Sequence, residues 1–227
     1  MVLASAAVDG VTNIVPGWTD QATSPYSSGL ESYTGPSNTL FDPPQSNGYG
    51  AWTLIPEDAI NTNAHTSTYG YLMRMFVPAN FSCGHLDMIC TANSGVTAAY
   101  FGLYSASSFA TGPLVYTGEV HASIVASTTA PVALTWNGAS SASSVNLIGG
   151  QTYWVYYTMT FSTSATLAGS VGTSVISMNP NLTASATSAN NAMQLASAQS
   201  ALAANTTLAP QTTWANYATK TWFGLRA

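Results

Sequence analysis

Two stretches of the chain alternate their side chains with the period of a β-strand, and this alternation restricts the fold more than any other feature. In TYGYLMRMFVP (68–78), one face carries Tyr69, Tyr71, Met73, Met75 and Val77, and Arg74 is on the other. In GGQTYWVYYTMTF (149–161), one face carries Tyr153, Val155, Tyr157, Met159 and Phe161. Because successive side chains of a strand point to opposite faces, each stretch predicts a strand with one face in a core.

Further segments of strand length follow, separated by Gly, Ser, Asn or Pro: HLDMIC, VTAAYFGLYS, GPLVYTGEV, APVALTW and a closing strand around Trp222 and Leu225. In FGLYSASSFATGPLVYTGE (101–119), two paired strands are expected across a Ser-rich turn that faces water. Phe101 and Leu103 share one face there, and Tyr104 lies on the other. Many short strands with turns between them predict an all-β fold, an antiparallel β-sandwich of jelly-roll type.

Residues 1–47 differ from the rest because prolines interrupt any regular element, at Pro16, Pro25, Pro36, Pro43 and Pro44. We expect an extended Pro-rich N-terminal arm over residues 1–47 and a β-sandwich domain over residues 48–227. The arm's aromatic residues favour docking on its own domain or on a neighbour, although the prolines also fit a loose linker; these are Trp18, Tyr26, Tyr33 and Phe41. The first residues do not resemble a secretory signal, which predicts that the chain accumulates first in a cytoplasm.

The Ala-rich segment 188–205 breaks the rhythm of strands. Ser188 could cap a helix with Leu195 and Leu202 on one stripe. No acidic residue favours its first turn and no basic residue its last. Helix and irregular chain therefore both remain open for this segment.

Charge is scarce: 5% of the 227 residues are charged, against about 25% in an ordinary soluble protein. Three basic residues cannot neutralise many phosphates, so nucleic acid is excluded as a partner. The apolar runs end far short of the roughly 20 residues of a spanning helix, so membrane insertion is not expected. Aromatic residues make up 11% of the chain, which argues for a folded protein.

The sequence offers little for catalysis, and we expect no catalytic residue, cofactor or metal. A glycosidase needs two carboxylates about 5–9.5 Å apart, and the pairing available is Glu57 or Asp58 with Glu119. Adjacent acids such as Glu57 and Asp58 more often form a solvated turn. The three histidines lack the short spacings typical of a zinc site; they are His65, His85 and His121.

Cys83, His85 and Asp87 share one strand face, which is the arrangement most like a nucleophile with its base. Neighbours two apart on a strand stand about 6.6 Å from each other at the backbone, so a structural role is favoured. Cys83 and Cys90 fall on opposite faces of a strand, and a disulfide would need a tight turn between them. Two reduced, mostly buried thiols are therefore expected.

Trp154 and Tyr156 lie on the face opposite the inward residues of their strand and need a separate explanation. They cover a second layer, form a subunit interface or line a ligand groove, in that order of preference. We take them as the candidate interface or ligand residues.

The order YGYLMRMFVPANFSCGHLDMIC, AAYFGLYSASS, PLVYTGEV and VNLIGGQTYWVYYTM resembles the β-sandwich domain of minor tail and fibre-like virion proteins of tailed bacteriophages. The ending TTLAPQTT…WFGLRA is also similar, although Ala209 interrupts the Leu-Pro pair of that family. The resemblance covers about residues 48–227. The arm lies outside it, the two cysteines are not part of its pattern, and the Ala-rich stretch 183–205 differs in length.

The resemblance implies a non-enzymatic virion surface protein, often an oligomer and often a trimer, in a tail or fibre involved in host attachment. We expect the arm to bind other virion proteins, with a host cell-surface glycan as a further partner. A capsid decoration protein and the carbohydrate-binding module of a secreted bacterial protein are the alternatives.

Overall fold

In the computed structural model, the chain divides between Asn47 and Gly48 into two units, each described by itself. The structure describes residues 44–54, 59, 61–93, 95–124, 131–137, 142–171, 192–195, 201–208, 215–217 and 219–227. In the first unit it describes a 3-10 helix, η3 (Pro44–Asn47). The rest of the predicted arm, with its four aromatic residues, lies outside the described residues.

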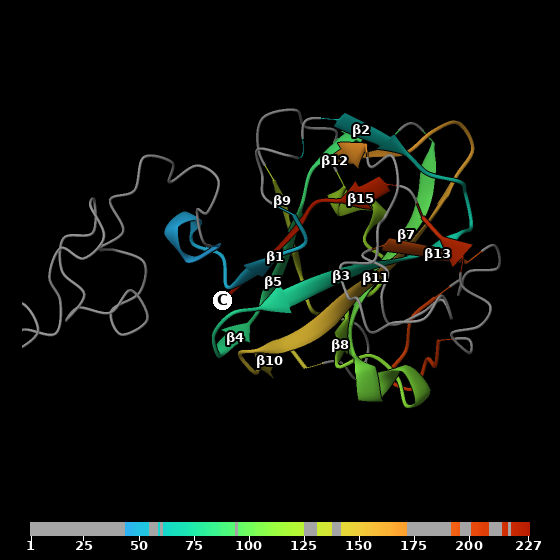
Figure 1. Ribbon diagram of the computed structural model, residues 1–227. Helices are drawn as coiled ribbons and strands as arrows, with labels where there is room; N and C mark the ends of the chain where they lie inside the picture. The colour runs from blue at the N-terminus through green and yellow to red at the C-terminus, as the bar shows by residue number, and fades with distance from the viewer. Residues whose placement is uncertain are drawn as a thin grey trace, which may run out of the picture. The chain divides into compact units, whose positions relative to one another are not determined.

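The second unit consists of antiparallel strands, as the sequence predicts, and no α-helix occurs in the part of the chain that the structure describes (Figure 1). The largest sheet has the order β14 (Ala215–Asn216), β13 (Ala192–Leu195), β3 (Gly70–Val77), β11 (Gln151–Phe161), β7 (Val96–Ser105), β8 (Val115–Tyr116). A second has the order β1 (Ala51–Trp52), β16 (Phe223–Arg226), β5 (His85–Met88), β9 (Val132–Thr135). A third joins β15 (Thr219–Thr221), β12 (Thr166–Val171), β2 (Asn61–Ala64) and β6 (Cys90–Ala92), and β10 (Val145–Leu147) pairs with β4 (Phe81–Cys83). Short 3-10 helices follow β7 and β8: η5 (Ala106–Ala110) and η6 (His121–Ser123).

Strand β11 lies between β3 and β7 and pairs with both along most of its length. Its predicted inward face is confirmed, because Tyr153, Val155, Tyr157 and Met159 are buried in the main core. The matching residues of β3 lie in the same core, namely Tyr71, Met73, Met75 and Val77. The alternation in the sequence therefore correctly predicts which residues of β3 and β11 face the main core.

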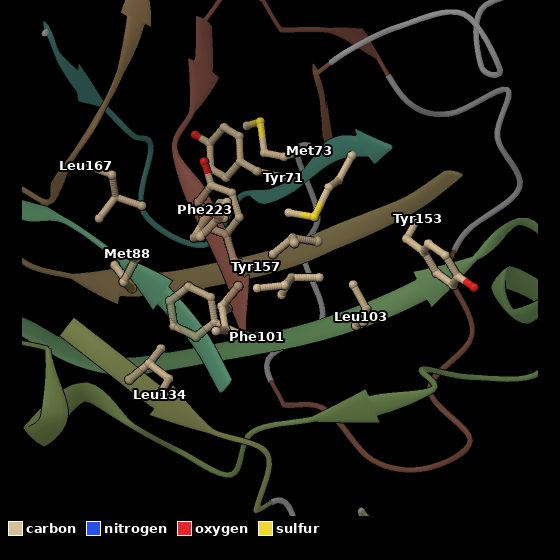
Figure 2. Packing of buried hydrophobic residues seen from close by; sticks show 14 of the residues in the cluster. Tyr71, Met73, Met88, Phe101, Leu103, Leu134, Tyr153, Tyr157, Leu167 and Phe223 are labelled. Atoms are coloured by element: carbon tan, nitrogen blue, oxygen red, sulfur yellow. The ribbon is translucent and has the colours of Figure 1, made fainter. Parts of the chain in front are cut away.

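The main core also takes side chains from the other sheets, which brings distant segments together (Figure 2). The ring of Phe101 on β7 lies 6.0 Å from that of Tyr157 on β11 and 6.1 Å from that of Phe223 on β16. Leu86 of β5 and Leu167 of β12 are fully buried in the same cluster. Burying each such side chain contributes roughly 1.5–3 kcal/mol, so this cluster is the main source of stability.

The segment 101–119 pairs as expected, with Gly102 opposite Tyr116 and Leu103 opposite Val115. Phe101 and Leu103 lie in the main core, and Tyr104 lies in the cluster on the other face. The Ser-rich connection forms η5, in which Ala106, Ser107 and Ala110 are exposed as predicted, whereas Ser108 is buried. The hydroxyl of Ser108 accepts from the amide of Ser105 at 2.9 Å, which satisfies both groups away from water.

The structure decides one segment that the sequence left open, and one expectation about local structure is wrong. Within 188–205, the described residues 192–195 form strand β13, which pairs with β3. Pairing with a long buried strand outweighs the helix propensity of an Ala-rich segment. HLDMIC is two strands, β5 and β6, which belong to different sheets, so Cys83 and Cys90 are not on opposite faces of one strand and both lie in the main core.

The central position of Phe101 leads to a test with a matched control. Phe101→Ala should lower the free energy of unfolding by about 3–5 kcal/mol, since it leaves a cavity in the main core. Phe76→Ala removes the same atoms from a side chain that is 59% exposed. This variant should change the free energy of unfolding by about 0.5 kcal/mol or less. Urea denaturation measures both, and equal effects would contradict this assignment of the core.

Candidate functional site

The outward face of the six-stranded sheet carries a second apolar cluster. It comprises Leu72, Tyr104, Tyr116, Trp154, Tyr156, Met193, Leu195, Leu202 and Leu208. The two candidate residues from the sequence both belong to it: Trp154 is 7% exposed and Tyr156 is fully buried. The structure therefore places both beneath other chain segments, and neither ring forms an open stacking surface.

Residues 201–208, which we call the strap, contribute two leucines to this cluster. The hydroxyl of Tyr104 donates to the carbonyl of Thr206 at 3.1 Å, and the amide of Leu208 donates to the carbonyl of Phe109 at 3.1 Å. Gly112 has a φ of +130° and approaches the backbone of Ala204 so closely that a Cβ there would clash. The strap is thus fixed to the loop that follows β7.

Cys83, His85 and Asp87 do not form a nucleophile with its base. Cys83 ends β4, is fully buried, and donates to the carbonyl of His85 at 3.5 Å. Burial raises the pKa of the Cys83 thiol to about 11, although its hydrogen bond with the backbone of His85 opposes the rise. The thiol is therefore protonated at neutral pH, and a thiol is a poor nucleophile.

Asp87 is buried and takes part in a polar contact between strands. The Nε of Arg226 donates to its two carboxylate oxygens at 3.2 and 3.0 Å, and the hydroxyl of Tyr49 donates to Oδ2 at 3.1 Å. Burial, followed by the charge of Asp87, raises the pKa of Tyr49 to about 12. These contacts join β5 to β16 and to Tyr49, two residues before β1, which is a structural role.

Glu119 ties the chain after β8 to the edge of β7. Its Oε1 accepts from the amides of Ala99 at 2.9 Å and His121 at 2.7 Å, and its Oε2 lies 2.6 Å from Nδ1 of His121. Burial alone would raise the pKa of Glu119, but these hydrogen bonds and the His121 ring hold it below its usual value. Glu57 and Asp58, the acids suggested as its partners, lie outside the described residues.

A buried polar cluster surrounds His65, and no sequence spacing indicated it. Its Nε2 lies 2.6 Å from the hydroxyl of Tyr157, which in turn lies 2.8 Å from that of Thr221. The hydroxyl of Thr53 donates to the carbonyl of Thr221 at 2.6 Å. His65 and Thr221 are 156 residues apart, and no spacing rule joins them. The alternation did place Tyr157 inward, which is the one signal that pointed to this cluster.

Across the described ranges, no three His, Cys, Asp or Glu residues gather closely enough to hold a metal ion. None of the described helices has the length and apolar character needed to cross a membrane. No family model matches the chain, and no curated protein matches it in sequence.

Both cysteines are free and buried, as the sequence favoured, and this makes their reactivity predictable. In the native protein, Cys83 and Cys90 should resist alkylation by iodoacetamide at pH 8, because burial raises the pKa of each thiol. Two thiols should react once urea unfolds the chain. Mass spectrometry counts the adducts, and rapid labelling of the native protein would contradict the burial of these residues.

The lowered pKa of Glu119 makes its contribution to stability depend on pH. That contribution is present above the unfolded pKa and is lost as the pH falls through the lower, folded pKa. Glu119→Gln resembles the protonated side chain, so it should destabilise the protein at pH 7 and have a smaller effect below about pH 4. Urea denaturation at both pH values tests this, and an effect that does not change with pH would contradict it.

Proposed function

We propose that this chain is a non-enzymatic structural protein of a bacteriophage virion, a tail or fibre component involved in host attachment. The observation that supports this most is that side chains of the types used in catalysis make structural contacts here. Cys83, Asp87 and Glu119 each take part in a structural contact, in a chain with 5% charged residues. An all-β protein of this kind is suited to holding shape and contacting partners.

The stability of such a protein depends little on salt. Ion pairs at a surface are screened over about 8–10 Å at ordinary ionic strength, whereas apolar packing and backbone pairing are not. In this chain, the large core is held by apolar packing, and β3, β11 and β7 are held by backbone pairing. This supports a particle surface exposed to varied conditions.

The proposal includes the finer architecture. We infer that residues 48–227 form a sandwich of jelly-roll type, in which the six-stranded sheet faces the two smaller sheets. The shared core of these three sheets supports this inference. The Pro-rich residues 1–47 would then act as an arm that binds another virion protein.

Particle composition tests this function. Quantitative mass spectrometry of purified virions from the source culture should find the chain at a few to a few tens of copies per particle. Hundreds of copies would indicate the alternative, a capsid decoration protein, and absence from every particle would overturn the virion proposal.

The oligomeric state gives a second test on the purified chain. We expect light scattering at micromolar concentration to report an oligomer, with a trimer favoured, because fibre-like proteins act as assemblies. A strict monomer would contradict the fibre assignment and would favour a protein that orders on a capsid lattice.

A further inference from the structure

An Asn-Gly pair, Asn47 and Gly48, lies at the boundary between the two units of the chain. An asparagine followed by glycine is prone to spontaneous deamidation, because the next backbone nitrogen attacks the side-chain carbon and glycine has no side chain to hinder it. Asn47 is the last residue of the 3-10 helix η3, and both Asn47 and Gly48 are exposed. Water therefore reaches the two groups that would react.

The backbone around Gly48 leaves room for this reaction. Its φ is +78°, in the left-handed region that glycine adopts without strain, and a Cβ there would meet no described atom within 4 Å. The sheet holds the chain from Gly50, whose amide donates to the carbonyl of Leu225 at 2.7 Å. The pairing of β1 with β16 starts at Ala51. A ring that closes at Asn47 therefore forms outside the β-ladder.

Two other exposed asparagines of the described chain lack this combination, and each is followed by a residue with a side chain. Asn205 precedes Thr206, whose amide nitrogen already donates to the carbonyl of Ala203 at 3.0 Å. The Oδ1 of Asn80 accepts from the amide of Gly149 at 2.7 Å, which holds its side chain in place. Both residues serve as references within the same molecule.

We propose that Asn47 is a site of self-modification, at which the chain forms isoaspartate and aspartate with water as the co-reactant. The backbone nitrogen of Gly48 loses its proton and bonds to Cγ of Asn47. The bond from Cγ to Nδ2 breaks, and that nitrogen leaves as ammonia with the proton. Water then opens the five-membered succinimide at either of its two carbonyls, and nothing is oxidised or reduced.

The modification changes the link between the two units in two ways. Each event replaces a neutral amide with a carboxylate, so the formal net charge becomes one unit more negative than −5. Isoaspartate also carries the main chain through its Cβ, which adds one carbon to the backbone between η3 and β1. This chemistry belongs to the chain itself and does not depend on the virion role proposed above.

Peptide mapping by mass spectrometry tests this on the purified full-length protein, incubated in heavy-oxygen water at pH 8.5 and at pH 6. The peptide with Asn47 should exchange its amide for a hydroxyl that carries heavy oxygen, and faster at pH 8.5, because the attacking nitrogen must lose a proton. Asn80 and Asn205 should react at least about tenfold more slowly, a factor that corresponds to about 1.4 kcal/mol in the barrier. Equal rates at the three asparagines, or an unchanged amide at Asn47, would overturn the proposal.

The products identify the mechanism. An isoaspartyl methyltransferase with a labelled methyl donor should modify the aged peptide, because opening of the succinimide gives isoaspartate as well as aspartate. Aspartate alone would indicate direct hydrolysis of the side chain and would contradict ring closure. The chain has a second Asn-Gly pair at residues 137–138, whose glycine lies outside the described residues, and the peptide map reports it separately.

A matched pair of glycine variants assigns the reaction to this dipeptide. Gly48→Ala should slow the loss of the Asn47 amide about tenfold or more, because a methyl group hinders the attacking nitrogen. Gly150→Ala is the control, since Gly150 has a φ of +79° and equally open surroundings, and it should leave the rate at Asn47 unchanged. Thermal unfolding shows that each variant is folded, and a parent-like rate in Gly48→Ala would contradict the attack by this nitrogen.

Discussion

The pairing of β11 with β3 on one side and β7 on the other is the constraint on which the other features depend. Seven consecutive residues of β11, 153–159, are buried, so this strand needs apolar cover on both of its faces. The smaller sheets supply it on the inward face, through Leu86, Leu167 and Phe223. On the outward face, the strap and η5 supply this cover. The six-stranded sheet therefore has a buried apolar cluster on each face.

Because few residues are charged, the contacts that each ionisable group makes are informative about its role. Asp87 can be buried because Arg226 and Tyr49 both donate to it, and removing either would leave its charge poorly compensated. Glu119 is used to satisfy backbone amides at the edge of β7. Arg74 differs from both, since it forms no salt bridge with any described residue.

Much of the fold could be predicted because period-two alternation is a local property. The faces of β3 and β11, the opposite sides taken by Phe101 and Tyr104, and the separate position of Trp154 and Tyr156 all follow from it. The sequence left the structure open, or predicted it wrongly, where contacts between distant segments determine it. Residues 192–195 form a strand because β3 offers them a pairing edge, and HLDMIC breaks in two because its halves join different sheets.

The sequence by itself determined the all-β class, the inward residues of the long strands and the poverty in catalytic groups, since each follows from composition or from neighbours along the chain. The tertiary structure decided what covers Trp154 and Tyr156 and which groups meet His65 and Asp87. These depend on which strands pair and in what register. Pairing is set by the packing of the whole core, because shifting a strand by one residue would exchange its buried and exposed faces.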